Sequence, residues 1–216
     1  MRTYQRIIAG GLVLAGLSGL FGCDRNGQDL EKRVEKTPYT SVESEQVGEE
    51  YRQFRSENNI GHSRNGASHT AANLSFAGAL SGKSFEELDN LYDQYRSLSN
   101  IGHSRNGASE TASILVNATI INPEYGNPNT IIQNYNFFRG QSNIGHSRDG
   151  ASETAAMLTY ATALNFGNPK KVLEIYNKFR NERNIGHSRN GASHTAAQLT
   201  LSTVIKENGY RFQKQE

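Results

Sequence analysis

Apolar and aromatic residues recur along this chain at helical spacing, in four segments of similar length. Eight, five and four residues before Asn59, Asn100, Asn143 and Asn184 stand two aromatic residues and an arginine. They are Tyr51, Phe54 and Arg55; Tyr92, Tyr95 and Arg96; Tyr135, Phe138 and Arg139; and Tyr176, Phe179 and Arg180. A further turn upstream an apolar residue follows the same pattern, at Val47, Leu88, Ile131 and Val172. Steps of three and four describe one face of an α-helix, so each segment is predicted to be a helix with an aromatic stripe in the core.

A second helix is predicted downstream of each of the four asparagines. A leucine stands at a fixed offset, and another apolar residue follows six positions later. These residues are Leu74 and Leu80, Leu115 and Ile121, Leu158 and Leu164, and Leu199 and Ile205. Each unit is therefore predicted to be a pair of helices joined by a turn.

The segment between the two helices of each unit has nearly the same sequence in all four units. The thirteen residues from Asn59 to Ala71, NIGHSRNGASHTA, return at 100–112, 143–155 and 184–196, with starts 41, 43 and 41 residues apart. Only two columns vary: Asn65 becomes Asp149 in the third copy, and the histidines His69 and His194 of the outer copies become Glu110 and Glu153 in the inner two. Self-similarity at such a period indicates a repeat array. Because the helices keep only their pattern while this phrase keeps its letters, the phrase has a role that the helices do not share.

Local capping signals place the starts of the first helices. Ser84 and Glu87 form a capping box, which predicts a helix over 85–98. Asn127-Pro128 and Asn168-Pro169 each place a capping side chain before a proline at the first helical position. Asn122-Pro123, Gly126 and Gly167 are expected to end the preceding helices.

The start of the second helix has two solutions. The caps are Ser63, Ser104, Ser147 and Ser188, or they are Ser68 and its three equivalents, which lengthens the connection to about ten residues. Connections between packed helices usually run about 2 to 8 residues, which favours the first set. Gly61 is then expected to be a left-handed residue that closes the first helix, and Gly66-Ala67 with Thr70-Ala71 to form a small-residue face that lets two helices approach closely.

The predicted fold is all-α: a short solenoid of four antiparallel helix-pair repeats over 47–209, followed by a polar tail at 210–216. In outline the repeats resemble tetratricopeptide and Sel1-like helical solenoids. The period is longer than the tetratricopeptide repeat, and the chain has no tryptophan. The first repeat has the least apolar opening helix, as expected of a terminal repeat.

The start of the chain has the order of features of a secretory signal. Arg2 and Arg6 precede an apolar run from Ile7 to Phe21, and the single cysteine, Cys23, follows Gly22. The run is shorter than the roughly 20 residues that span a bilayer, which favours a cleaved signal over a permanent helix. The segment resembles a bacterial lipoprotein signal, which implies that residues 1–22 are removed and that Cys23 receives the lipid. The alternative is an ordinary signal peptide with an incidental cysteine.

The resemblance implies attachment to a bacterial cell membrane on its extracytoplasmic side, and Asp24 resembles the pattern that retains lipoproteins in the inner membrane of enteric bacteria. Residues 23–46 are charged and polar and are predicted to form a flexible tether after the lipidated cysteine. A single cysteine excludes a disulfide framework.

The charge balance argues against nucleic acid as a partner. The chain has 23 Lys plus Arg and 21 Asp plus Glu, and because Arg2 and Arg6 lie in the leader, the remainder carries 21 of each. A nucleic-acid-binding domain normally has a basic excess.

The phrase itself is the candidate binding site. A serine hydroxyl, free backbone N–H groups and an arginine at a helix start suit an anion. Four such turns in a row suit a repetitive ligand, such as an anionic cell-envelope glycan or a protein segment, through multiplied modest contacts. The candidate residues are His62, Ser63, Arg64, His103, Ser104, Arg105, His146, Ser147, Arg148, His187, Ser188 and Arg189.

The alternative is a structural spacer in which the phrase serves inter-repeat packing only. Glycine, asparagine, serine and threonine are what tight turns and caps require, and the arginines would then bond to helix-end carbonyls and the histidines to backbone carbonyls. No enzyme activity, cofactor or metal is expected. His62 and His69 lie two helical turns apart, and Glu110 and Glu153 replace the second histidine, so no constant ligand set exists. A serine next to a histidine in sequence is not a catalytic triad.

Overall fold

The computed structural model describes residues 41–208, with side chains from residue 45 onward, and this part of the chain is made of helices without any strand. Its eight helices are α3 (Ser41–Ser56), α4 (Arg64–Ser81), α5 (Phe85–Arg96), α6 (Arg105–Ile121), α7 (Pro128–Arg139), α8 (Arg148–Leu164), α9 (Pro169–Arg180) and α10 (Arg189–Glu207). The all-α class predicted from the periodicity is confirmed. The leader, Cys23 and the polar tail lie outside the described residues.

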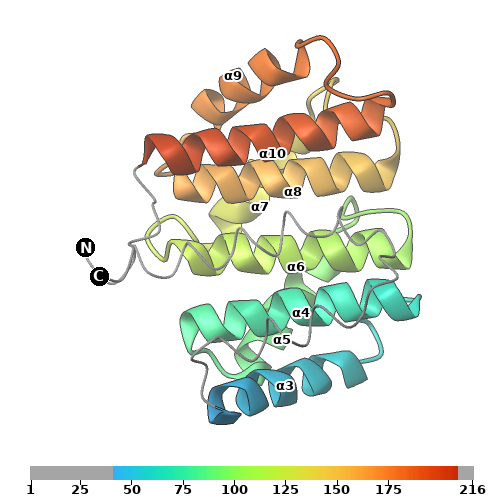
Figure 1. The fold of residues 1–216 in the computed structure, drawn as a ribbon, viewed down its shortest axis with the longest axis vertical. Helices are drawn as coiled ribbons and strands as arrows, with labels where there is room; N and C mark the ends of the chain where they lie inside the picture. Colours follow the sequence, from blue (N-terminus) through green and yellow to red (C-terminus); the bar gives the residue numbers. More distant parts are fainter. Residues whose placement is uncertain (1–40, 209–216) are drawn as a thin grey trace.

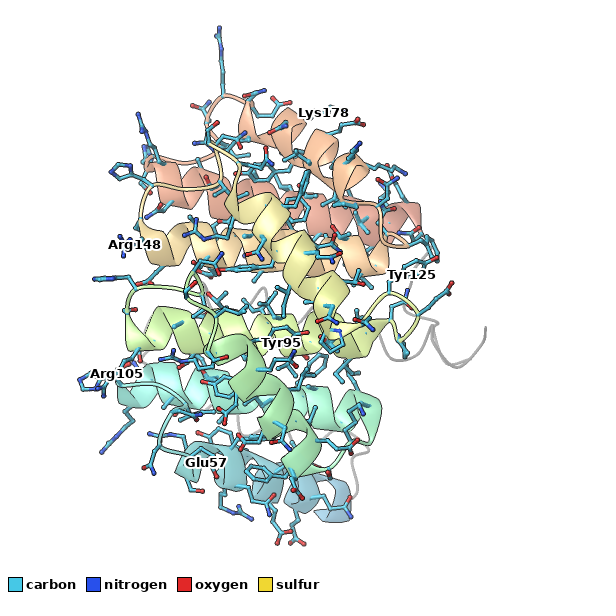
Figure 2. All side chains as sticks on the ribbon, turned by 180° about the vertical axis from the view of Figure 1, so that it is seen from behind. Glu57, Tyr95, Arg105, Tyr125, Arg148 and Lys178 are labelled. Atoms are coloured by element: carbon cyan, nitrogen blue, oxygen red, sulfur yellow. The ribbon has the colours of Figure 1, made fainter. Side chains whose placement is uncertain are left out.

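The helices form pairs that follow one another in chain order (Figure 1). The long helices α4, α6, α8 and α10 lie side by side in one layer, and each packs against the next. The other helices cover them, with α5 against α6, α7 against α8 and α9 against α10. Figure 2, from behind, shows α5 and α7 crossing over the long helices.

The helix starts follow the local signals. Ser84 and Glu87 form the complete capping box, with the serine hydroxyl accepting from Glu87 N–H and the Glu87 carboxylate accepting from Ser84 N–H. Pro128 and Pro169 open α7 and α9 behind the capping residues Asn127 and Asn168. The helix predicted to run to residue 98 ends at Arg96.

One further boundary differs from the prediction, and one agrees with it. Helix α3 begins at Ser41, inside the segment assigned to the tether. Helix α6 ends at Ile121, directly before Asn122-Pro123.

The aromatic stripe forms the core, as predicted. Tyr92, Tyr95, Tyr135 and Tyr176 are the largest fully buried side chains, together with Phe54 and Phe138. The pattern weakens only at the two ends of the row of helices. Val47 is 46% exposed and Leu199 is 39% exposed, although their equivalents in the other pairs are buried. Each of these equivalents packs against a neighbouring helix pair. In the described part of the chain, Val47 and Leu199 have no such helix pair beside them.

Candidate functional site

Each copy of the phrase begins a long helix with a serine cap. The hydroxyls of Ser63, Ser104, Ser147 and Ser188 accept the N–H of the glycine three residues on, at distances of 3.0, 3.0, 3.1 and 3.0 Å. The shorter turn favoured by the sequence is therefore confirmed. The alternative caps lie inside the helices, where Ser68 donates to the carbonyl of Arg64 at 2.8 Å.

The prediction that Gly61 closes the first helix is wrong, because α3 already ends at Ser56. Its φ of +147° instead brings the chain back against the start of α4, where a Cβ on Gly61 would lie 2.9 Å from the backbone nitrogen of Ala67. A side chain has no room there, so a close return of the chain explains the glycine.

An asparagine or aspartate from the next helix pair clamps each of the first three turns. Asn106 Oδ1 accepts the backbone N–H of His62 at 2.7 Å and of Ser63 at 3.0 Å, and its Nδ2 donates to Ser63 Oγ at 2.8 Å. Asp149 accepts in the same way from His103 and Ser104 at 2.6 and 3.0 Å. Asn190 repeats the arrangement on His146 and Ser147. The seventh column of the phrase therefore ties successive helix pairs together.

The leading asparagine of each of the first three copies accepts hydrogen bonds from the next pair through its carbonyl. Asn59 O accepts from Tyr92 Oη at 3.0 Å and from Ser109 Oγ at 3.1 Å. Asn100 and Asn143 accept from the equivalent tyrosines and serines of the next pair: Tyr135 and Ser152, and Tyr176 and Ser193. The buried tyrosine stripe thus also fixes the register between pairs.

The glycine of the eighth column lets these clamps reach their turns. A Cβ on Gly66 would stand 2.5 Å from Asn106 Cγ, and one on Gly107 would stand 2.5 Å from Asp149 Cγ. At Gly150 the corresponding distance to Asn190 Cγ is 2.7 Å. The small-residue face predicted for the second helix is present, and the clamp is the physical reason for its glycine.

The histidine and arginine side chains that flank each capping serine have a different environment. His62, Arg64, His103, Arg105, His146, Arg148, His187 and Arg189 are all exposed. Within residues 45–208 no hydrogen bond or ion pair holds any of these side chains. Figure 2 shows Arg105 and Arg148 at one edge of the molecule, pointing away from it. By contrast, the upstream arginines Arg96 and Arg180 donate through Nε to Ser109 and Ser193.

The twelve predicted site residues thus have two different roles in the structure. The serines cap helices, and the histidines and arginines form a row of exposed cationic and ring side chains along the edge where the long helices begin. We call this the His-Arg row.

The second variable column of the phrase contains His69, Glu110, Glu153 and His194. These side chains interact with one another in the structure, which the sequence did not predict. His194 Nδ1 lies 3.3 Å from Glu153 Oε1, and His194 Nε2 lies 3.0 Å from Gln198 Nε2. Burial raises the pKa of Glu110 and the neighbouring charge of Glu153 raises it further, while His69 and His194 oppose this. Burial also raises the pKa of Glu153 and lowers that of His194. Burial therefore disfavours the charged forms of both partners in the contact between Glu153 and His194.

In the described part of the chain, no group of three or more His, Cys, Asp or Glu residues has a geometry that would hold a metal ion. None of the helices between residues 41 and 208 is long and apolar enough to cross a membrane. Comparison with protein-family models, with curated proteins and with solved structures finds no significant match to this chain.

Proposed function

We propose that this chain is a lipid-anchored, non-catalytic binding or scaffolding module. Its helix pairs act as a solenoid of four repeats that presents the His-Arg row to an anionic, repetitive ligand. The proposed anchor is Cys23, which would hold the module on the extracytoplasmic side of a bacterial membrane. The proposed partner is an anionic glycan or protein of the cell envelope.

The exposure of the His-Arg row is the observation that carries this proposal. The other polar columns of the phrase have packing partners: the leading asparagine meets Tyr92 and Ser109, and the seventh column meets the preceding turn. The histidine and arginine columns are identical in all four copies, yet their side chains face solvent. Packing does not explain why the same histidine and arginine recur at these positions. Contact of each turn with the same chemical group of a ligand would explain it.

The physical basis is electrostatic and multivalent. Each arginine sits on the first residue of a long helix, where the helix dipole and unpaired N–H groups favour negative charge. A guanidinium binds carboxylate, sulfate or phosphate through two parallel hydrogen bonds. Four weak contacts on one polymer reinforce one another because the later ones form within the same complex.

The test removes the two inner arginines. Arg105→Gln with Arg148→Gln is compared with Lys178→Gln with Arg183→Gln, which removes the same charge from exposed positions outside the phrase. Full-length protein in detergent is eluted by salt from immobilised heparin as a model polyanion, and from isolated peptidoglycan. We expect the phrase variant to elute at lower salt than the control pair, with an unchanged melting temperature. Equal elution of the two variants would contradict binding through the His-Arg row.

The competing function is a structural spacer, and the hydrogen bonds that Asn106, Asp149 and Asn190 accept from the preceding turns favour it. A spacer predicts that the arginine variants keep their retention on the polyanion. The anchor is tested separately: a fatty-acid label should mark the wild type and not Cys23→Ser. Equal labelling of both proteins would exclude the anchor and leave the binding test unaffected.

A further inference from the structure

The two ends of the row of helix pairs carry complementary halves of the junction that joins successive pairs. Inside the chain, each junction places a turn of one pair against a tyrosine, a serine and an asparagine or aspartate of the next. The α9–α10 end carries another turn, and the α3–α4 end carries another such set of side chains. In the part of the chain that the structure describes, neither half is covered.

At the α9–α10 end the turn stands open. The backbone N–H groups of His187 and Ser188 and the carbonyl of Asn184 occupy the columns that are bonded at the three internal junctions. Within residues 45–208 no partner meets these three groups. Leu199 is 39% exposed here, whereas Leu74, Leu115 and Leu158 are fully buried.

At the α3–α4 end the matching side chains have no partner within the described residues. Asn65 is exposed and occupies the column of the clamps Asn106, Asp149 and Asn190. Tyr51 is only partly buried, although Tyr92, Tyr135 and Tyr176 in its column are 0% exposed. Val47 is 46% exposed on the same helix as Tyr51. This end therefore offers the acceptor, the hydroxyl donor and the apolar contact that the opposite end lacks.

The residue types at both ends are those found at the internal junctions. Gly66, Gly107 and Gly150 have no room for a Cβ because the clamp side chain of the next pair lies within 2.7 Å of that point. At Gly191 the only close atom among residues 41–208 is Ser188 Oγ of its own turn, at 3.0 Å, yet the residue is still glycine. Asn65 is likewise a clamp residue with no turn to clamp in the described chain.

We propose that the α9–α10 end of one chain docks on the α3–α4 end of a second copy, which continues the packing of the internal junctions from chain to chain. Asn65 of the second copy would accept from His187 N–H and Ser188 N–H, and Tyr51 Oη would donate to Asn184 O. Because the two surfaces differ, the association is heterologous, and each added copy leaves the same two ends open. The association does not depend on any ligand of the His-Arg row, although it would lengthen that row.

One column makes this junction weaker than the internal ones. Asn59 Nδ2 donates to Asp93 Oδ1, and Asn100 and Asn143 donate to Asn136 and Asn177 at 2.8 and 2.7 Å. The α3–α4 end has Arg52 in this position, which offers no acceptor. Asn184 must therefore turn its amide to present Oδ1 to the guanidinium. Arg52→Asn restores the internal arrangement and is expected to strengthen the association.

Cysteine cross-linking in the full-length chain tests the geometry. A Cβ on Gly107 would lie 2.8 Å from Asp149 Cβ, so cysteines in the equivalent columns of two docked copies, Asn65→Cys and Gly191→Cys, are within reach of a disulfide. Under mild oxidation the double variant should give a ladder of dimers, trimers and larger species. Each single variant should give no species larger than a dimer, and it also shows how much cross-linking Cys23 contributes. The control pair Asn90→Cys with Gly191→Cys has the same number of thiols, and Asn90 is exposed on α5, so no ladder is expected.

Sedimentation of the unmodified chain provides a measurement that does not depend on the cysteine variants. Average mass should rise with concentration, rise further in Arg52→Asn, and fall in Leu199→Lys. The control is Phe166→Lys, which changes another exposed apolar residue away from both ends and should leave the mass unchanged. A wild type that stays monomeric at every concentration, or an association that stops at a dimer, would overturn the proposal.

Discussion

Asp149 accepts the backbone N–H of His103 at 2.6 Å, across the junction between two helix pairs. It is the one charged member of a column that otherwise contains asparagine. Burial alone would raise the pKa of Asp149, but the hydrogen bonds from Ser104 and His103 together outweigh this effect and hold the pKa below its ordinary value of 3.8.

The junction at Asp149 should therefore weaken in acid. A folded-state pKa below the unfolded value means that the carboxylate stabilises the fold above about pH 4, and that this stabilisation is lost as the pH falls through the folded pKa. Asp149→Asn should remove this part of the acid dependence. Urea denaturation at pH 7 and pH 3 measures it, and Asn106→Asp should introduce the same dependence at another junction. An identical loss of stability in acid for Asp149→Asn and wild type would contradict the assignment.

The clamp itself predicts a difference between two asparagines of the same column. Asn106→Ala removes two accepted N–H bonds and one donated bond, and leaves the turn at His62 unpaired, so it should cost about 1 to 3 kcal/mol of unfolding free energy. Asn65→Ala is the matched control, because Asn65 is exposed, and it should change stability by less than about 0.5 kcal/mol. Chemical denaturation of both variants measures the contrast. Equal effects would show that the column acts through local helix propensity.

Tyr135 should contribute through both its ring and its hydroxyl. Its Oη donates to Asn100 O at 2.8 Å while the ring is fully buried. Tyr135→Phe should cost about 1 kcal/mol through the lost hydrogen bond, and Tyr135→Ala about 3 to 5 kcal/mol through the cavity. Tyr51→Phe should have little effect on the melting of dilute protein, since the described part of the chain offers Tyr51 no preceding turn to bond. A Tyr135→Phe variant as stable as wild type would rule out the register role of the hydroxyl.

The neighbouring carboxylates Glu110 and Glu153 should oppose folding at neutral pH. Burial raises the pKa of both groups, and the charge of Glu153 raises that of Glu110 further. With a raised folded-state pKa, the favourable contribution exists below the unfolded value and is lost as the pH rises through the folded pKa. Glu110→Gln should thus raise stability at pH 7 by roughly 0.5 kcal/mol, the scale of solvent-screened pairs. The gain should vanish below about pH 4. Thermal melts across this range decide the point, with Glu49→Gln as an exposed control.

The sequence by itself determined the features that depend on neighbouring residues. A serine three residues before its glycine or glutamate, or a proline after an asparagine, creates a cap from atoms within one turn, so Ser63, Ser84 and Asn127 precede their helices as expected. The aromatic stripe likewise follows from helical periodicity, because residues such as Tyr92 and Tyr95 share one face of one helix. Fold class and most helix starts therefore follow from the sequence.

Only the tertiary structure separated the identical columns of the phrase into different roles. Asn106 and Arg105 are adjacent in the same phrase, yet the asparagine clamps a turn from the preceding pair and the arginine faces solvent. That distinction depends on where one helix pair lies against the next, which is set by contacts between residues more than thirty positions apart, such as Tyr92 and Asn59. The same physical reason explains the exposure of Val47 and Leu199. They occupy the same positions in the repeat as buried apolar residues, but at the two ends of the described row of helix pairs no neighbouring pair covers them.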